Sequence, residues 1–223
     1  MNQQSNGQRS RLIKIFDLAT VLVFAVLMVS LFIRLGTTAQ ETGRWWIVAS
    51  TLLPGYLIAD LSAGLVHWFC DSFFAEDTPL VGKILIQPFR EHHRDPQAIT
   101  RHGFFELNGN NCLAMIPLLL FSWLAGGPGA ESSLSLFMHS FVFSLSLAIF
   151  ATNQFHRWAH THKPLTLISW LQRSNLILKP ERHQRHHNDH DRGFCVTSGW
   201  MNPLLDALLF SPRIELLVRF LQR

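Results

Sequence analysis

Long apolar runs separated by polar stretches dominate the first two thirds of the chain. The clearest is LATVLVFAVLMVSLFI, and three more begin at WWIVASTLLPGYLIA, CLAMIPLLLFSWLAGG and LSLFMHSFVFSLSLAIFATNQF. Each approaches the roughly 20 residues that a helix needs to cross a bilayer, and neighbouring helices can accommodate Pro54 and Pro117. The pattern predicts an all-α integral membrane protein with about four transmembrane helices, at about 13–35, 45–69, 110–127 and 134–156.

The polar connections between these runs are unequal in length. GTTAQETGR and GGPGAES are short enough to be turns, whereas the stretch from Cys70 to Asn111 and the tail after Phe155 are long and contain most of the Lys and Arg residues. Because loops rich in Lys and Arg stay in the cytoplasm, the long loop and both termini are predicted to be cytoplasmic. Residues 1–11 are expected to be a flexible cytoplasmic tail, and residues 12–223 a single multi-pass membrane domain.

Two segments of the tail mix apolar and charged positions, LTLISWLQRSNLIL and PLLDALLFSPRIELLVRFL. Such a mixture is typical of helices that lie flat in the membrane interface. Both are therefore expected to be interfacial helices, which either cap a site at this membrane face or only anchor the tail.

Composition agrees with a membrane protein and exposes one anomaly. Of 223 residues, 48% are hydrophobic and only 15% charged, against roughly 25% charged in soluble domains. The three cysteines form no CxxC pair, which argues against disulfides and thiolate zinc sites. The formal net charge of +4 favours anionic lipid headgroups or an acidic protein partner, and no nucleic-acid partner is expected. The anomaly is histidine, with twelve copies against a single tyrosine.

Ten of these histidines are predicted to converge just inside the cytoplasmic membrane face, several of them at helical spacings. In NQFHRWAH, Asn153, His156 and His160 lie at i, i+3 and i+7, and HQRHHNDH places four histidines at i, i+3, i+4 and i+7. The ten are His67, His92, His93, His102, His156, His160, His183, His186, His187 and His190. The two others, His139 and His162, are interpreted as isolated polar residues.

One stripe of the second span carries polar residues as well. Asp60, Gly64, His67 and Asp71 lie at i, i+4, i+7 and i+11. An aspartate inside an apolar run costs about 2.5–3.5 kcal/mol on insertion scales. Asp60 is therefore expected to face the bundle interior and to have a partner there, and Gly64 to allow the close approach of another segment.

Ten imidazoles are too many for one metal ion and about right for two. Histidine ligands without thiolates suit iron, zinc or copper. Asp71 would either complete the ligand set or orient a histidine from outside it, and Asp60, Asn153 and Glu91 are further candidates for such roles. A two-iron site can use O2 to remove hydrogen from an unactivated carbon, and a lipid chain is the substrate that a membrane offers.

Several blocks of the chain resemble the plasmanylethanolamine desaturases, the Kua-type lipid desaturase family. They are ADLSAGLVHWFCDSF, PLVGKILIQPFREHHRDPQAITRH, NGNNCL, TNQFHRWAH and GFCVTSGWMNPL, and the resemblance extends over about residues 55–210. It implies that a vinyl ether bond is formed in the sn-1 alkyl chain of an ether phospholipid, as in plasmalogen formation. It also implies O2 as the oxidant and two irons held by histidines. The ten histidines and Asp71 match family positions, although the stretch from His187 to Phe194, which contains His190, is one residue shorter than in animal members.

The resemblance leaves the substrate open, because plant relatives desaturate an acyl chain of phosphatidylglycerol with the same oxidant. FREHHRDP favours the ether-lipid branch by resemblance. No dinucleotide fingerprint or haem motif is present, so no bound NAD, flavin or haem is expected. A cytochrome b5-like or ferredoxin-like donor would supply the electrons, and Arg90, Arg94 and Arg101 would contact that donor or the lipid phosphate. The host membrane would be a bacterial inner membrane or the endoplasmic reticulum.

Two other classes of protein remain as alternatives. A metal transporter would need ionisable residues through the membrane depth, whereas the predicted spans are nearly uncharged beyond Asp60. A zinc-dependent membrane hydrolase would need a carboxylate base beside its metal, for which Glu91 is the candidate. The metal content of the purified protein separates these classes, because two irons per chain indicate a desaturase and one zinc indicates a hydrolase.

Overall fold

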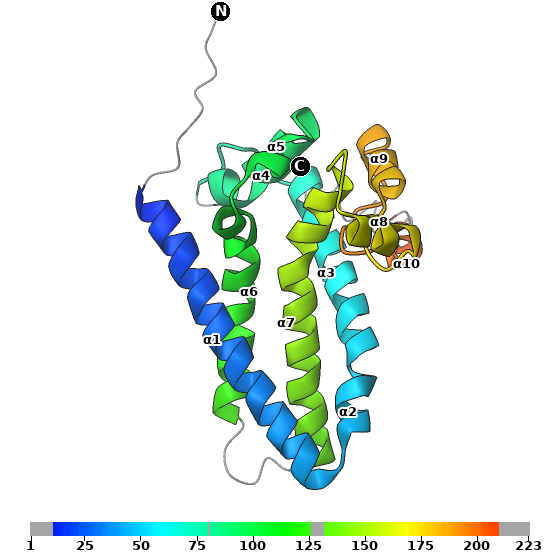
Figure 1. The fold of residues 1–223 in the computed structure, drawn as a ribbon. Coiled ribbons are helices and arrows are strands. Elements are labelled where there is room, and N and C mark those ends of the chain that lie inside the picture. The colour runs from blue at the N-terminus through cyan, green and yellow to red at the C-terminus, as the bar shows by residue number, and fades with distance from the viewer. Residues whose placement is uncertain (1–10, 80, 126–131, 210–223) are drawn as a thin grey trace, which may run out of the picture.

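The structure is a computed structural model, and it describes residues 11–79, 81–125 and 132–209. All regular elements in these ranges are helical, and four helical segments are long and apolar enough to cross a membrane (Figure 1). These segments are α1 (Arg11–Thr42), α2 with α3 (Trp45–Ser50 and Leu52–Ser72), α6 (Phe104–Ala125) and α7 (Ser133–Ala159). The predicted all-α membrane bundle is confirmed.

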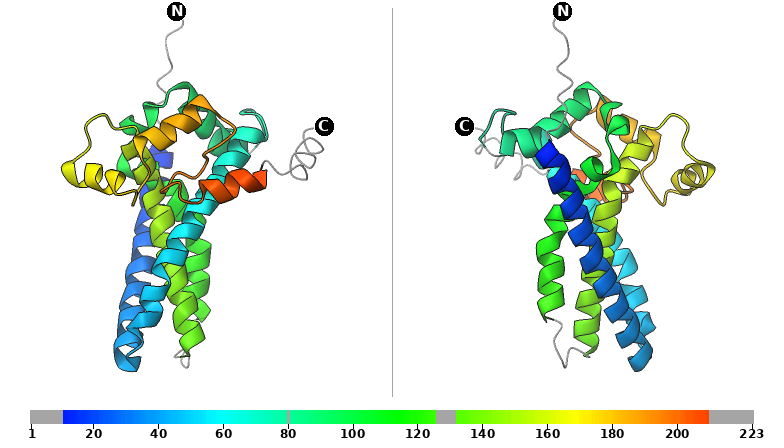
Figure 2. Two further views of the ribbon diagram at one scale, coloured as in Figure 1. Left: turned by 90° about the vertical axis from the view of Figure 1, so that its right-hand side faces the viewer. Right: turned by 60° about the vertical axis from the view of Figure 1, so that its left-hand side comes forward.

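Short helices between and after the spans form a head at one end of the bundle (Figures 1 and 2). They are a π-helical turn, η1 (Gly82–Ile86), followed by α4 (Gln87–Arg94), α5 (Ala98–Arg101), α8 (Thr166–Arg173), α9 (Pro180–Asn188) and α10 (Asn202–Leu209). The first span starts at this same end, so residue 11 and the head lie together.

The helix boundaries differ from the sequence prediction in three places. The third span, predicted from about residue 110, begins at Phe104. The segment GTTAQETGR, predicted to be a turn, continues α1 as far as Thr42, and the chain reverses at Gly43 with a φ of 66°. The second span is interrupted at Thr51, between α2 and α3. Pro54, three residues further on, has no N–H to donate to the carbonyl of Ser50, which explains an interruption here. Pro117 lies inside α6 without interrupting it.

The bundle is apolar both inside and outside. Phe24, Met28, Leu31 and Leu119 are buried between the spans, while Phe121 and other large apolar side chains stay exposed on their outer faces. Water would penalise such an exposed apolar belt, but lipid chains solvate it.

Small residues bring α3 and α7 into close contact. A Cβ atom on Gly55 would lie 2.6 Å from the Cβ of Ser144, and the hydroxyls of Thr51 and Ser144 are 3.2 Å apart. Lipid gives no hydrophobic drive to helix association, so close packing of small residues and buried hydrogen bonds hold such helices together. This contact sets α3 beside α7, and both reach the head.

The two tail segments predicted to be interfacial helices are helical in part. α8 and α10 lie crosswise to the spans on different sides of the head (Figure 2). The side chains of Leu165, Leu167 and Trp170, at and in α8, are exposed, whereas Ile168 and Gln172 are buried. This two-sided pattern agrees with a helix in a membrane interface. The second predicted segment is helical up to Leu209, and its remainder lies outside the described residues.

Candidate metal centre

Four helices deliver histidines to one place at the head end of the bundle. His67 lies near the end of α3, His92 and His93 on α4, and His156 and His160 at the end of α7. On α9, His183 and His186 are buried while the two residues between them are exposed, and His187 is half-buried beside them. Two spans and two helices of the head, far apart in the sequence, therefore meet around these imidazoles.

A first group of potential metal ligands contains only histidines: His92, His160, His183 and His187. The Nε2 atom of His92 lies 3.1 Å from that of His160, 3.1 Å from that of His187 and 3.3 Å from that of His183. Ligand nitrogens about 2.0–2.1 Å from a tetrahedral metal ion lie roughly 3.3 Å apart. Converging lone pairs of neutral imidazoles repel one another, and a cation between them removes this repulsion.

His156 lies against this first group. Its Nε2 atom is 2.9 Å from Nε2 of His92 and 2.7 Å from Nε2 of His183. A fifth imidazole therefore faces the same point from α7.

The second group combines three histidines with a carboxylate: His67, Asp71, His93 and His186. The Oδ2 atom of Asp71 lies 2.9 Å from Nε2 of His93, 3.3 Å from Nε2 of His67 and 3.7 Å from Nε2 of His186. Asp71 was predicted either to bind the metal or to orient a histidine. In the structure it stands among the potential ligands.

Backbone carbonyls orient two histidines of the second group. The Nδ1 atom of His67 lies 3.1 Å from the carbonyl oxygen of Phe194, and Nδ1 of His186 lies 2.7 Å from that of Arg192. A carbonyl can only accept, so each Nδ1 carries the proton and donates it. This tautomer leaves the Nε2 lone pair free to bind a metal, which is the usual arrangement around metal-bound histidines.

Consecutive histidines contribute to different groups. His92 belongs to the first group and His93 to the second, with ring centroids 5.9 Å apart. The same division holds for His187 and His186, again with ring centroids 5.9 Å apart. Because one residue step separates ligands of the two groups on both α4 and α9, the two groups are immediate neighbours.

Burial and unpaired polar atoms support metal binding. The Nε2 atoms of His67 and His186 and the Oδ1 atom of Asp71 are buried without a hydrogen-bond partner among the described residues. Unpaired buried polar atoms are costly, and metal ligation removes that cost. The donor set therefore fits two metal ions.

Five buried or half-buried histidines of the head have lowered pKa values and are neutral. Burial, and then the neighbouring imidazoles, lower the pKa of His92 and His183, and the same causes lower the pKa of His187 to about 3 and that of His160 to about 4. Burial also lowers the pKa of His186 to about 4. Neutral imidazole is the form that binds metal ions.

Seven of the ten predicted histidines belong to the two groups and His156 lies against the first, whereas the remaining two lie apart. The Nδ1 atom of His102 lies 3.1 Å from Oε1 of Glu106, on the outer side of the head. His190 is exposed, and its ring centroid lies 4.6 Å from that of His93. Eight histidines thus gather where the sequence analysis expected ten.

The other polar candidates have structural contacts instead. The amide of Asn153 donates to the carbonyl of Leu107 on α6, 2.7 Å away. Glu91 is exposed and accepts from Gln87. Asp60 is fully buried and accepts hydrogen bonds from the chain after α9, as expected of a buried aspartate with a partner inside the bundle. At the opposite end of the bundle, Nδ1 of His139 pairs with the hydroxyl of Ser122 at 2.7 Å.

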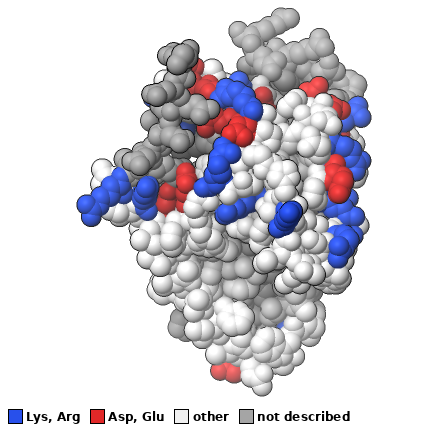
Figure 3. Space-filling view, turned by 45° about the horizontal axis from the view of Figure 1, so that its top comes forward, with Lys and Arg blue, Asp and Glu red and all other residues white. Residues whose placement is uncertain are grey.

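The arginines predicted to contact a phosphate or an electron donor are already engaged. Arg94 binds Glu76, Arg101 binds Asp95, and Arg90 donates to the carbonyl of Phe74. Acidic and basic side chains alternate over the head (Figure 3). This face is therefore less uniformly basic than the sequence suggested.

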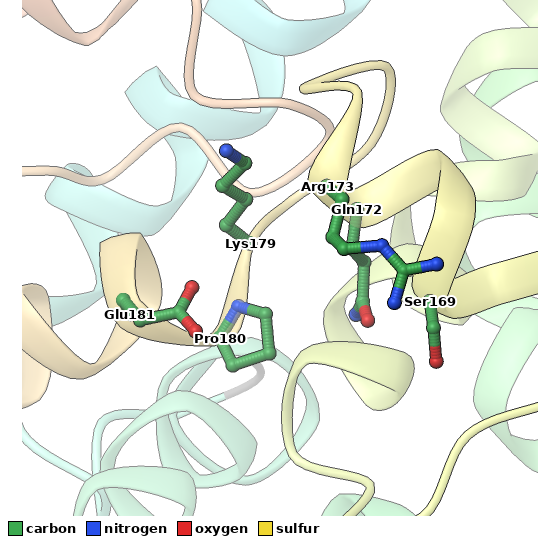
Figure 4. A pocket seen from close by; sticks show the side chains of 6 residues that line it. All are labelled: Ser169, Gln172, Arg173, Lys179, Pro180 and Glu181. Carbon is green, nitrogen blue, oxygen red and sulfur yellow. The ribbon is translucent and has the colours of Figure 1, made fainter.

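Two basic side chains beside α9, unlike these three arginines, line a hollow in the surface. Arg173 and Lys179 line a hollow of about 310 Å³ together with Ser169, Gln172, Pro180 and Glu181 (Figure 4). Neither cation has a side-chain partner among the residues that the structure describes. No sequence pattern marked these two residues as site residues.

The carbonyls of Arg192 and Phe194 were likewise not predicted to contact the histidines. Backbone acceptors leave no trace in residue type, and only the block GFCVTSGW marked this segment as a family feature.

Comparison with known proteins gives consistent matches. Residues 56–223 match the lipid desaturase domain family. The chain is 41% identical over 210 residues to a plasmanylethanolamine desaturase of Myxococcus xanthus, covering 92% of this chain and 72% of that protein. It is 41% identical over 177 residues to plasmanylethanolamine desaturase 1 of Mus musculus, covering 78% of this chain and 65% of that protein.

A plant relative is more distant. Fatty acid desaturase 4, chloroplastic, of Arabidopsis thaliana is 32% identical over 169 residues, which cover 74% of this chain and 50% of that protein. No solved structure matches the chain. The family match spans most of the chain and includes all residues of both ligand groups, and the chain therefore belongs to the lipid desaturase family.

Proposed function

We propose that this protein is an O2-dependent membrane desaturase that introduces the vinyl ether double bond into the sn-1 alkyl chain of ether phospholipids. The observation that carries the proposal is the pair of adjacent ligand groups, four histidines in one and three histidines with Asp71 in the other. The names of the bacterial and mouse relatives support an ether-lipid substrate.

Two irons bound at these groups would supply the oxidising power for removing hydrogen from an unactivated carbon. The reaction balances when the –CH2–CH2–O– unit loses two hydrogens and O2 is reduced to two waters. The substrate supplies two of the four electrons, and an external donor supplies the other two together with two protons. The residues of the chain hold the metals, keep the imidazoles neutral and exclude water from the buried part of the site.

The depth of the ligand groups supports a reaction close to the lipid headgroup. His67 lies five positions before the end of α3 and His156 three positions before the end of α7, which corresponds to about 5–8 Å of helix. The ether oxygen and its neighbouring carbons lie at the glycerol, near the membrane surface. A bond beside the ether oxygen would therefore lie at the level of these histidines.

The partners follow from this chemistry. A cytochrome b5-like or ferredoxin-like protein would deliver electrons at the face that carries the head, which we assign to the cytoplasm from the distribution of Lys and Arg. The host membrane would be a bacterial inner membrane or the endoplasmic reticulum. Arg90, Arg94 and Arg101 are candidates for contact with the donor or the lipid phosphate. Arg173 and Lys179 join them, because their side chains line an open hollow and have no partner among the described residues.

An acyl-lipid desaturase is the second candidate, supported by the name of the Arabidopsis relative. Both reactions need the same oxidant and the same ligands, so lipid analysis must separate them. The test is expression in a host that contains alkyl ether phospholipids but no plasmalogens, followed by acid hydrolysis of the extracted lipids. Acid cleaves a vinyl ether to a free fatty aldehyde, because protonation gives a cation that the ether oxygen stabilises.

Aldehyde is expected with the wild-type chain and not with His92→Ala. A new double bond in an acyl chain without aldehyde would favour the second candidate. Unchanged lipids from a chain that binds two irons and receives electrons would refute both. Elemental analysis of the same protein adds an independent reading, because one zinc per chain would instead indicate a hydrolase.

A further inference from the structure

A buried carboxylate in the membrane span binds the segment that follows the last histidines. Asp60 on α3 has no exposed surface. Its Oδ1 atom accepts from the backbone N–H groups of Thr197, Ser198 and Gly199, at 3.0, 2.9 and 3.1 Å. Its Oδ2 atom accepts from the Ser198 hydroxyl at 3.1 Å and from the N–H of Met201 at 3.0 Å. Five hydrogen bonds thus join one side chain to residues 197–201.

The same segment touches the second ligand group. Three residues before Thr197, the carbonyl of Phe194 accepts the Nδ1 proton of His67. Gly64, between Asp60 and His67 on α3, permits this contact, because a Cβ there would lie 2.5 Å from the Sγ of Cys195. The polar stripe of α3 is therefore the surface on which residues 194–201 lie.

The segment also positions α9, which contributes to both ligand groups. The backbone N–H of Leu178, two residues before α9, donates to the carbonyl of Thr197 at 2.9 Å. Arg182, next to His183, donates to the carbonyl of Ser198 at 2.6 Å. Ser198 thus contacts Asp60 through its N–H and hydroxyl, and α9 through its carbonyl.

We propose that Asp60 is a positioning residue for the metal centre: its carboxylate anchors residues 194–201, which in turn orient His67 and hold α9 against α3. The inference rests on the proposed metal-dependent function. It assigns Asp60 no contact with metal or substrate, so its role is to keep ligands from α3 and α9 in register.

Asp60→Asn is the direct test, because it conserves shape and removes one acceptor. The amide nitrogen that replaces one carboxylate oxygen cannot accept from the Ser198 hydroxyl and the Met201 N–H. Ser198→Ala is the milder variant, since it removes one of the five hydrogen bonds and leaves the carboxylate in place. Ser122→Ala is the matched control, because it breaks a buried polar pair with His139 at the far end of the bundle.

Three measurements are made on each chain, purified in detergent. The first is iron(II) bound per chain by elemental analysis, and the second is the visible ligand-field spectrum after loading with cobalt(II). The third is modification of Cys195 by a maleimide, located by mass spectrometry. All three cysteines are buried, so the wild-type chain is expected to resist modification.

Asp60→Asn is expected to bind less than half the wild-type metal, to change the cobalt spectrum, and to react at Cys195 at least about tenfold faster, as the loss of hydrogen bonds to a carboxylate implies. Ser198→Ala should change the metal content, the cobalt spectrum and the rate of Cys195 modification in the same directions as Asp60→Asn, but by smaller amounts. Ser122→Ala should match the wild type.

Full metal content and an unchanged cobalt spectrum in Asp60→Asn would overturn the proposal, even if Cys195 became reactive. If Asp60→Asn does not fold, wild-type values in Ser198→Ala would overturn it instead. A wild-type chain that binds no metal also overturns it. A wild-type chain that binds two metal ions but forms no vinyl ether refutes only the proposed function.

Discussion

The Oδ2 atom of Asp71 on α3 lies 2.9 Å from Nε2 of His93 on α4, 22 positions away in the sequence. Asp71 supplies the single carboxylate of the two ligand groups, so the two groups are chemically unequal. A carboxylate adds negative charge at one metal, whereas the other metal would be surrounded by neutral imidazoles.

Asp71→Asn is expected to lower bound metal by about one ion per chain, because an amide is a far weaker ligand than a carboxylate. Activity should fall by about 100-fold or more, at least as much as when residues supporting a metal site are changed. Metal analysis and vinyl ether yield check both. Asp95→Asn, which changes an exposed carboxylate of the head, should keep two metals. Wild-type metal content in Asp71→Asn would remove Asp71 from the ligand set.

His183→Ala is expected to abolish activity while the protein still accumulates in the membrane. The Nε2 atom of His183 lies within 3.3 Å of the Nε2 atoms of His92, His156 and His187. The hydrophobic core of the bundle does not include His183. His139→Ala should retain most activity, since His139 pairs with Ser122 far from the head. Lipid analysis measures both variants, with the amounts of protein in the membrane matched by immunoblot. An inactive His139→Ala together with an active His183→Ala would mean that the metal centre is wrongly assigned.

His102→Ala should behave differently from His92→Ala, although both belong to the block FREHHRDPQAITRH. His102 pairs with Glu106 outside both ligand groups. We expect His102→Ala to keep its metal content and His92→Ala to lose at least one ion per chain. Equal metal loss in the two variants would show that His102 joins the ligands when metal is bound.

The metal-free protein should lose stability as the pH falls below about 6.5, the ordinary pKa of histidine. Burial lowers the pKa of His187 to about 3 and those of His160 and His186 to about 4. Between these values and 6.5 the unfolded chain binds more protons than the folded one, so acid favours unfolding. The melting temperature of chelator-treated protein should therefore fall from pH 7.5 to pH 5. The double variant His160→Gln/His187→Gln should show a weaker dependence, and an unchanged slope would argue against these groups as its origin.

Gly64→Ala is expected to destabilise the protein, because the new Cβ would lie 2.5 Å from Sγ of Cys195 and 2.7 Å from Cδ2 of Leu205. Overpacking of this kind costs about 1–3 kcal/mol. Gly36→Ala is the control, since its Cβ would meet nothing closer than 4.0 Å. Thermal unfolding in detergent measures both, and equal melting temperatures would contradict the close packing of α3 against Cys195.

Some properties of this protein follow from its sequence alone. A transmembrane helix depends on the hydropathy of about 20 consecutive residues, so the four spans could be predicted without knowledge of the fold. The spacings in NQFHRWAH and HQRHHNDH likewise place histidines on one helix face, because helical periodicity is local. The buried partner of Asp60 was also predictable, since an unpaired carboxylate is costly in the apolar part of a membrane. The close approach at Gly64 was predictable because a residue without a side chain lets another segment pack against the helix.

Only the tertiary structure decided how these elements combine. It assigns His92 and His93 to different ligand groups, brings Asp71 to His93, and leaves His102 outside with Glu106. It also makes the carbonyl of Phe194 the partner of His67. These relationships depend on the paths of loops and on contacts between α3, α4, α7 and α9, which spacing within one helix does not encode. Backbone acceptors carry no signature in residue type, so a sequence reveals which residues can bind a metal but not which atoms orient them.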